Sequence, residues 1–501
     1  MKVLFLALPS SLSVQNIATR SELMLNHVKN RDEVFVLKCG GEQPYCYSNF
    51  LKNKSICLKC NLLCDSSLDI LNIPNKNIFY LNKDISFQDI PKKFRNIKEL
   101  KEFNIEGINL GFGVASYMIS LLREINFDTI EQKDTIYSIC KSAVLIYEST
   151  LNLLKKIKPD LVYIWNGRFF DSWAALSACK SLGISFRLFE SINGFKYNEK
   201  KQIIYKYSFI ENDLLHSLDP FKRDIFKSWQ NKDLNKEIKV EIGKSFFEDK
   251  VQRKDMYVFC KDQDLEKLPI GFDFAKKNIV IFNSSIEEYA AFDEWQNSIY
   301  LNENEGIEKI VQSLKGNPEI KIYLRVHPHL KNVNSSQIKD LRRIGSLGFE
   351  NLQIIWPEEK IDSYALLKNC SKILTFGSTM GVEACFWKKT SILVGRAFYE
   401  DLNCSYIPKS HEEVIDLIQK DMDPKPQENA VIYGYWANTS GIEYKYFKPE
   451  GDLASGTLIG IDIWKNVSLA NRLKHKYLVL KDFGFKNIIK IRLNKLKQKF
   501  I

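Results

Sequence analysis

Residues 320–330 read IKIYLRVHPHL, an apolar, strand-like run that ends in the basic residues Arg325, His327 and His329. Further along the chain, residues 372–387 read KILTFGSTMGVEACFW, a second apolar run followed by a small-residue turn and a helix-like segment. In a parallel sheet, ligands bind at the carboxyl ends of the strands, and a turn into a helix offers backbone N–H groups to an anion. We expect the two strand ends to be neighbours that hold one phosphate group. The sequence therefore predicts an α/β protein with a nucleotide-linked substrate.

The size and composition are those of a soluble protein with more than one domain. The chain has 501 residues, of which 45% are hydrophobic and 27% are charged. It contains no run of about 18 uncharged apolar residues, so a membrane-spanning helix is not expected. Residues 1–9 carry a single lysine and lead directly into a polar stretch, which favours a buried first strand over a signal sequence.

Strand-like and helix-like segments alternate twice along the chain, and a charged, mostly helical stretch separates the two series. This pattern predicts two Rossmann-like, doubly wound domains that face a cleft. We expect an N-terminal domain at 1–250 with a Cys-rich insertion at 39–64, and a C-terminal, nucleotide-binding domain at 251–430. Residues 431–501 are expected to form a helical extension that ends in a basic amphipathic tail.

The second series carries the residues that suit a nucleotide phosphate. Basic side chains at a strand end form charge-assisted hydrogen bonds, and a Ser/Thr turn before a helix supplies further donors. An acid in the first helical turn is expected to accept hydrogen bonds from ribose hydroxyls. A simpler interpretation stays open, in which the serine and threonine only cap a helix and the histidine packs in the core. The expected binding residues are Ser284, Arg325, His327, Gly377, Ser378, Thr379, Gly381 and Glu383.

The first series carries candidates for a general base. Glu190 ends the strand-like run 185–189, where its side chain is expected to face the cleft, and Asp171 is the second candidate. Asn166 and Arg168 follow another buried strand and are expected to line the cleft, where they contact the acceptor or the leaving group.

Four cysteines lie close together in the irregular segment near the start of the chain. Four thiolates can bind zinc tetrahedrally and hold such a segment together. Because the spacing is not standard, the alternative of unligated or redox-sensitive thiols stays open. The usage of cysteine otherwise indicates a reducing, cytoplasmic setting. The candidate structural zinc ligands are Cys39, Cys46, Cys57 and Cys60.

The motifs resemble those of one enzyme family. Residues 325–328 (RVHP) look like the HP motif of bacterial capsule and surface-polysaccharide glycosyltransferases, and 377–384 (GSTMGVEA) resemble their Ser/Thr-rich nucleotide motif. The following 387–395 (WKKTSILVG) are similar to the continuation of that motif, with Lys388 and Thr390 in place of the usual Gly and Pro. The resemblance implies a GT-B fold, no cofactor required for catalysis, and a catalytic His327 that stabilises the departing nucleotide phosphate.

The same resemblance implies a function and its substrates. We expect a glycosyltransferase that moves a sugar from a CMP-, CDP- or UDP-linked donor to a surface polysaccharide or a lipid-linked glycan. In the better understood branches of the family the donors carry cytidine nucleotides. Two other functions stay open: a non-hydrolysing nucleotide-sugar epimerase, and a non-catalytic subunit of a polysaccharide assembly complex.

The end of the chain is strongly basic, with six Lys or Arg and no acid within 486–501. Its apolar residues recur at helical spacing, which suits either an anionic membrane surface or a terminal helix packed on the protein body. No nucleic-acid-binding motif accompanies the net charge of +11, so nucleic acid is not an expected partner. We therefore expect a cytoplasmic protein, and peripheral contact with the inner face of the membrane stays open beside a packed terminal helix.

Overall fold

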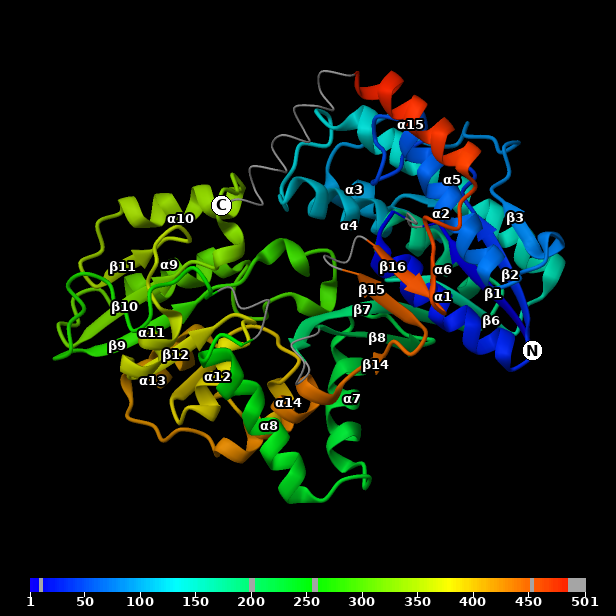
Figure 1. Ribbon diagram of the computed structural model, residues 1–501. Helices are drawn as coiled ribbons and strands as arrows, with labels where there is room; N and C mark the ends of the chain where they lie inside the picture. The colour runs from blue at the N-terminus through cyan, green and yellow to red at the C-terminus, as the bar shows by residue number, and fades with distance from the viewer. Residues whose placement is uncertain (9–11, 198–202, 255–259, 451–454, 485–501) are drawn as a thin grey trace.

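The computed structural model describes the chain except residues 9–11, 198–202, 255–259, 451–454 and 485–501. It contains two mainly parallel sheets, each covered by helices on both faces (Figure 1). The predicted α/β architecture with two Rossmann-like domains is confirmed.

The N-terminal sheet has the strand order β14-β8-β7-β6-β1-β2-β3. Its first five strands along the chain pair in parallel, whereas β8 pairs antiparallel with both β7 and β14. The strands are β1 (Lys2–Ala7), β2 (Glu33–Lys38), β3 (Ile78–Tyr80), β6 (Leu161–Trp165), β7 (Phe186–Tyr197), β8 (Ile203–Glu211) and β14 (Ile442–Glu443). The alternation of side chains along β1 explains the two cores, because Leu4 and Leu6 pack on one face of the sheet and Val3 and Phe5 on the other.

Helices and a short hairpin complete this domain. One face of the sheet is covered by α4, α5 and α6, and the other by α1 and α2. The elements are α1 (Val14–Lys29), α2 (Lys54–Ile70), α3 (Ile97–Lys101), β4 (Asn104–Ile105), β5 (Ile108–Asn109), α4 (Gly111–Leu122), α5 (Lys133–Ile157) and α6 (Phe170–Ser181).

The C-terminal sheet is entirely parallel and has the order β11-β10-β9-β12-β13. The chain starts at the central β9, adds β10 and β11 on one side, and then adds β12 and β13 on the other. The elements are β9 (Lys277–Phe282), α9 (Glu303–Ser313), β10 (Ile320–Arg325), α10 (Ser336–Ser346), β11 (Leu352–Ile355), α11 (Ser363–Asn369), β12 (Lys372–Thr375), α12 (Met380–Phe386), β13 (Thr390–Leu393) and α13 (His411–Gln419).

Three helices connect the two domains: α7 (Leu218–Gln230), α8 (Lys236–Val251) and α14 (Gln427–Thr439). The backbones of α8 and α14 approach closely, since a Cβ on Gly434 would lie 2.2 Å from the carbonyl oxygen of Gly243. Both α7 and α8 pack against α12 and α14, so these helices lie on the C-terminal domain. After α14 the chain returns to the N-terminal sheet as β14.

The segment predicted as a helical extension contains strands as well as helix. After β14 come β15 (Phe447–Glu450), β16 (Ser455–Leu458) and β17 (Ile461–Asp462), which form a small antiparallel sheet against α1. The last described helix, α15 (Leu469–Phe483), packs on α2. The basic tail predicted at 486–501 lies outside the described residues. Among the described helices, none has the length and apolar content needed to cross a bilayer.

Candidate functional site

The strand order places a topological switch point in the C-terminal sheet between β9 and β12, where ligands of open parallel sheets bind. The turn at Gly377 follows β12, Ser284 follows β9, and the HP motif follows β10. The expectation that β10 and β12 are neighbours is wrong, because β9 lies between them. The spacing of strands separates their ends by about 10 Å, so His327 and the Ser/Thr turn contact different parts of a ligand.

Two buried donors lie at the middle of this edge. Within the described part of the chain, the Asn283 side-chain nitrogen and the Ser284 hydroxyl oxygen are buried and have no hydrogen-bond partner. A Cβ on Gly377 would lie 3.6 Å from the Ser284 hydroxyl, so the turn after β12 adjoins this serine. Leaving such groups unpaired costs free energy, which a ligand oxygen accepting from them recovers. The position predicted for Ser284 is therefore supported by its geometry.

His327 is held in a defined tautomer by its own loop. Its backbone N–H donates to Asn283 Oδ1 at 2.7 Å, and its Nδ1 accepts from the backbone N–H of His329 at 3.2 Å. Because Nδ1 accepts, the neutral ring carries its proton on Nε2. Burial lowers the pKa of His327 to about 4, so the ring is neutral at physiological pH and acts as a hydrogen-bond donor.

Arg325 has a structural role, contrary to the prediction that it contacts phosphate. The side chain is 2% exposed and donates to the carbonyl oxygens of Trp356 at 2.6 Å and Glu359 at 3.3 Å. Tyr323, two residues earlier on β10, lies on the same face of the sheet as Arg325, and Leu324 packs on the opposite face. The guanidinium therefore fixes the loop after β11 and does not face the switch point.

The small-residue turn at 377–381 links β12 to α12, and its residues have different roles. Ser378 Oγ accepts from the Met380 N–H at the start of α12 at 3.3 Å, whereas Thr379, the N-cap residue, makes no side-chain capping bond. Thr379 is exposed. Gly381 serves packing, because a Cβ there would lie 2.2 Å from Tyr399 Oη. A contact between Gly381 and a phosphate is therefore not supported, whereas Gly377, Ser378 and Thr379 stay candidates.

The Glu383 carboxylate is hydrogen-bonded to other side chains of the chain. Its carboxylate is 2% exposed and accepts from Lys250 Nζ at 2.9 Å, Tyr364 Oη at 2.7 Å and Thr379 Oγ1 at 3.1 Å. The predicted ribose contact is contradicted by this arrangement, since no carboxylate oxygen faces the switch point without a donor already bound.

The opposing edge of the N-terminal domain brings together Asn166, Glu190 and His216. The Asn166 side-chain nitrogen lies 3.2 Å from both Glu190 carboxylate oxygens and 3.1 Å from His216 Nε2. Burial raises the pKa of Glu190 above the usual glutamate value, against the opposing effects of Asn166 and Arg168. The Glu190 side chain is still 29% exposed, so an acceptor can reach it.

His216 was not found from the sequence. It lies in the segment between β8 and α7, in no motif, and only the fold brings it within 4.0 Å of Glu190. Burial, together with the charge of Arg168, lowers the pKa of His216 to about 3. A neutral imidazole next to Glu190 leaves that carboxylate free to act as the base.

Asp171 is not accessible as a base. Its side chain is 1% exposed, and burial raises its pKa to about 6. One carboxylate oxygen accepts from the Ser172 N–H at 2.8 Å. The first turn of α6 directs Asp171 into the protein body, so its predicted catalytic role is contradicted.

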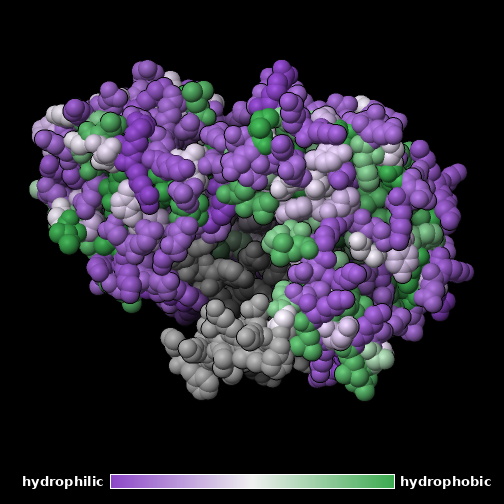
Figure 2. All heavy atoms as spheres, turned by 90° about the horizontal axis from the view of Figure 1, so that it is seen from above, coloured by the Kyte–Doolittle hydropathy of each residue, from purple (hydrophilic) through white to green (hydrophobic). Residues whose placement is uncertain are grey.

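Arg168 spans the two domains. Its guanidinium donates to the carbonyl oxygen of Glu288 at 2.8 Å and to Ser120 Oγ at 2.8 Å, and its Nε is buried and unpaired within the described residues. The predicted position in the cleft is thus supported by contacts on both sides. Figure 2 shows the surface hollowed between the two domains.

A second set of contacts joins the domains at the HP loop. Arg123, the C-cap of α4, pairs with Glu287 at 2.7 Å and donates to the carbonyl oxygen of His329 at 3.0 Å. Next to it, Glu124 accepts from the backbone N–H and the hydroxyl of Ser336, each at 2.5 Å. The N-terminal domain therefore holds the HP loop and the start of α10 in place.

Replacing Arg123 by Ala is expected to loosen this contact. Glu287 is 8% exposed and would lose its cation, which costs about 2 kcal/mol of the free energy of unfolding. Urea unfolding measures this loss. Arg343→Ala is the control, because Arg343 pairs with two carboxylates but is 49% exposed, and its replacement should change stability little. Equal effects of the two variants would contradict a coupling between the domains at Arg123.

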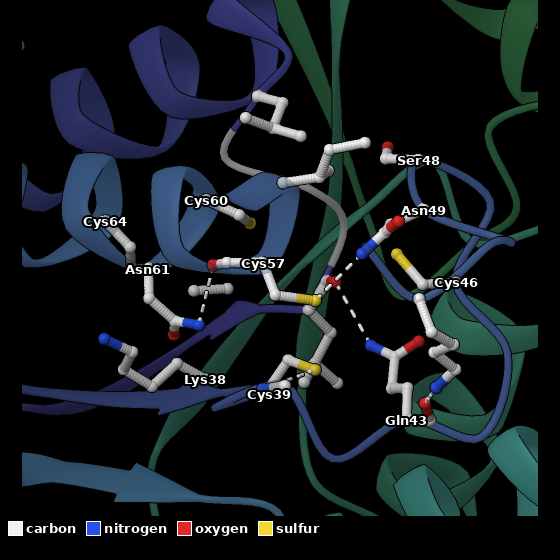
Figure 3. Close-up of a pocket in the computed structure, with 16 residues that line it drawn as sticks. Lys38, Cys39, Gln43, Cys46, Ser48, Asn49, Cys57, Cys60, Asn61 and Cys64 are labelled. Carbon is white, nitrogen blue, oxygen red and sulfur yellow. Dashed lines mark hydrogen bonds between the residues drawn. The ribbon is translucent and has the colours of Figure 1, made fainter. Parts of the chain in front are cut away.

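The predicted zinc ligands line a pocket between β1, β2 and α2 (Figure 3). The cavity is about 40 Å³, and the sulfur atoms of Cys39, Cys46 and Cys57 point into it. Cys57 Sγ accepts from the Asn49 side-chain nitrogen at 3.0 Å. Burial raises the pKa of Cys46 to about 12 and also raises that of Cys39, so both are thiols at neutral pH.

The cysteines do not form a tetrahedral site in this arrangement. Across the described residues, no group of three or more His, Cys, Asp or Glu side chains could hold a metal ion. The reason is geometric: Cys39 follows a strand, Cys46 lies in a loop, and Cys57 and Cys60 lie one turn apart on α2. Zinc binding stays a prediction that would require these thiols to move together.

Comparison with known proteins finds a family likeness in the C-terminal part of the chain. Residues 237–405 match the family model of capsule polysaccharide biosynthesis proteins. The predicted resemblance to this family is thereby confirmed. The matched segment includes the switch point, the HP motif and the Ser/Thr-rich turn.

Solved structures give weaker likenesses. A KpsC beta Kdo 2,4 transferase from Thermosulfurimonas dismutans is 13% identical, covers 56% of this chain and 80% of that chain, and has a TM-score of 0.34. A UDP-GlcNAc 2-epimerase from Neisseria meningitidis, bound to UDP-GlcNAc, is 12% identical, with coverages of 86% and 97% and a TM-score of 0.28. At such TM-scores we infer nothing about activity from them. No curated protein matches the chain.

Proposed function

We propose that the protein is a glycosyltransferase of capsule or surface-polysaccharide biosynthesis. It takes a sugar from a CMP-, CDP- or UDP-linked donor and passes it to a glycan or lipid-linked glycan acceptor, without a metal. The observation that carries the proposal is the set of donors at the switch point, where His327 lies beside the unpaired side chains of Asn283 and Ser284. This set lies in the segment that matches the capsule biosynthesis family.

The donor binds at the carboxyl edge of the C-terminal sheet. The Nε2–H of His327 and the Asn283 and Ser284 side chains donate to oxygens of the nucleotide phosphate. The Ser378–Thr379 turn lies on the other side of β9 and contacts a second part of the donor. These donors are placed before the reaction begins, so they stabilise the charge of the departing phosphate without reorganising.

The acceptor binds against the N-terminal domain with its hydroxyl at Glu190. That carboxylate takes the hydroxyl proton as the oxygen attacks the anomeric carbon, and the bond from that carbon to the phosphate oxygen breaks. The electron pair leaves with the phosphate. Asn166 orients the Glu190 carboxylate, and Arg168 holds the domains at the distance that the reaction needs.

A thermal-shift screen with CMP, CDP, UDP and GDP tests the donor site. We expect cytidine or uridine nucleotides to raise the melting temperature with EDTA present. A nucleotide at a hundredfold excess over its Kd stabilises the folded protein by about 2.7 kcal/mol. The Asn283→Ala variant, which lacks one unpaired donor and the partner of the His327 N–H, should shift less. No response to any nucleotide would contradict the proposed donor site.

Product analysis separates transfer from the other functions. A transferase consumes donor only when acceptor is present, whereas an epimerase interconverts nucleotide sugars without acceptor. A non-catalytic subunit does neither. Incubation of the protein with each nucleotide sugar, with and without glycan acceptor, therefore distinguishes the three.

A further inference from the structure

The described end of the chain carries an apolar stripe that faces solvent. Along α15, the side chains of Leu469, Leu473, Tyr477 and Leu480 are 64%, 53%, 64% and 45% exposed. At 100° per residue these four positions span an arc of about 80° on one side of the helix. We call these four residues the α15 stripe. Four large apolar side chains in one row, all open to water, indicate a surface that another apolar phase covers.

The orientation of α15 is set by contacts on its opposite face. Asp482 accepts from the Ser55 N–H at the start of α2 at 2.8 Å, and the His475 ring packs edge-on against Trp464. Lys59 of α2 lies 5.7 Å from the centre of the same Trp464 ring. These contacts anchor the helix to the N-terminal domain, so the α15 stripe points away from the protein.

Basic residues flank the α15 stripe on both sides. By helical geometry Lys476 lies about 20° beyond one edge, and Lys474 and Lys481 lie about 40° to 60° beyond the other. All three are exposed. Long lysine side chains beside an apolar row can place their ammonium groups at lipid phosphates while the row enters the acyl region. The one acid of α15, Asp482, is directed to α2.

The loop before α2 extends this surface. Phe50 and Leu51 are 64% and 67% exposed and precede the end of α2 that Asp482 contacts. Lys54, at the start of that helix, is exposed as well. Figure 2 views the molecule from the side on which α15 lies and shows hydrophobic side chains exposed among hydrophilic ones.

We infer that the α15 stripe, with Phe50 and Leu51, docks the N-terminal domain onto an anionic lipid bilayer. An apolar row flanked by lysines fits that surface better than it fits a second copy of this basic chain, because two such faces would repel each other. Docking there would bring the acceptor domain to the membrane, where a lipid-linked glycan is presented. The inference rests on α15 and its contacts and does not require the proposed transfer activity.

Vesicle co-sedimentation of the full chain, without any sugar nucleotide, tests this inference. We expect binding to vesicles of equal parts phosphatidylcholine and phosphatidylglycerol, and little to phosphatidylcholine alone. The L473S/Y477S variant should bind the mixed vesicles about tenfold to a hundredfold more weakly. Its circular dichroism should match that of the wild type, because both side chains face solvent. Binding should also weaken as salt is raised.

The control removes two apolar side chains elsewhere that are more exposed than those of the α15 stripe. Ile270 and Leu301 lie in the C-terminal domain and are 97% and 92% exposed, so I270S/L301S should bind like the wild type. Undiminished vesicle binding of L473S/Y477S would overturn the inference. A wild-type dimer in sedimentation velocity that L473S/Y477S abolishes would also overturn it, since the stripe would then be an interface between two copies.

Discussion

Replacement of His327 by Ala is expected to lower kcat for sugar transfer by about 10²- to 10³-fold while the fold is retained. His327 supplies a neutral Nε2–H donor at the switch point, because its Nδ1 accepts from the His329 N–H and burial lowers its pKa to about 4. The lost hydrogen bond is strongest when the nucleotide phosphate departs, so kcat should fall more than donor affinity. Steady-state kinetics with the donor identified by thermal shift measure both quantities.

The control for this variant is another histidine of the same domain. His411, at the start of α13, forms hydrogen bonds with Tyr300 and Ser313. Because α13 does not contribute to the switch point, His411→Gln should keep transfer activity near that of the wild type. A circular dichroism spectrum and melting temperature close to those of the wild type establish that His327→Ala folds. Full activity of a folded His327→Ala enzyme would rule out the role of the HP motif in holding the leaving group.

Glu190→Gln is expected to lower kcat by about 10²- to 10⁴-fold, because the amide cannot take the proton of the attacking hydroxyl. Burial raises the pKa of Glu190, and only the ionised form acts as base. Wild-type activity should therefore fall as the pH drops through a value above that of an ordinary glutamate. Since His327 is already neutral throughout this range, the acid limb of the profile reports on Glu190. A pH series of kcat for the wild type measures this limb.

The melting temperature of Glu190→Gln is a second measurement on this variant. A raised pKa means that folding favours protonated Glu190, so stability is lost as the pH rises from the unfolded pKa through the folded pKa, and the full cost is present above the folded pKa. Glu190→Gln should therefore melt at an equal or higher temperature than the wild type at neutral pH. Glu211→Gln, on the neighbouring β8, serves as the exposed control and should keep activity. An inactive Glu190→Gln with a lowered melting temperature would point to misfolding and not to a lost base.

The two sites face each other because the domains contact at several points. Arg168 reaches Glu288, Arg123 reaches Glu287 and the HP loop, and Glu124 holds the start of α10. Burial alone would raise the pKa of Glu124, but hydrogen bonds from Ser336 and Asn126 lower it. The carboxylate form therefore stabilises the contact above the usual glutamate pKa, and this stabilisation is lost as the pH falls through the lowered value.

Local sequence patterns were sufficient for the elements that carry the candidate site and for placing several candidate residues at strand ends, but not for β8 or for the strands β15 to β17. Apolar runs predicted β10 and β12, because strands buried on both faces require continuous apolar side chains. Polar and charged residues that follow apolar runs predicted candidate site residues, because the carboxyl ends of parallel strands meet at one edge of the sheet. These were His327 and Ser284 in one domain, and Asn166 and Glu190 in the other.

Tertiary structure alone decided how these groups are used. The order of the strands put β9 between β10 and β12, which no local pattern encodes. Packing of α8 against the C-terminal domain supplied Lys250 to Glu383, far away in sequence, and so removed that acid from the site. The direction of Arg325 toward the loop after β11, and the approach of His216 to Glu190, likewise depend on which faces pack together. Helix and strand propensities and the pattern of polar residues act over a few neighbouring residues. The contact partners of a side chain from distant parts of the chain depend instead on which faces of helices and sheets are buried against each other.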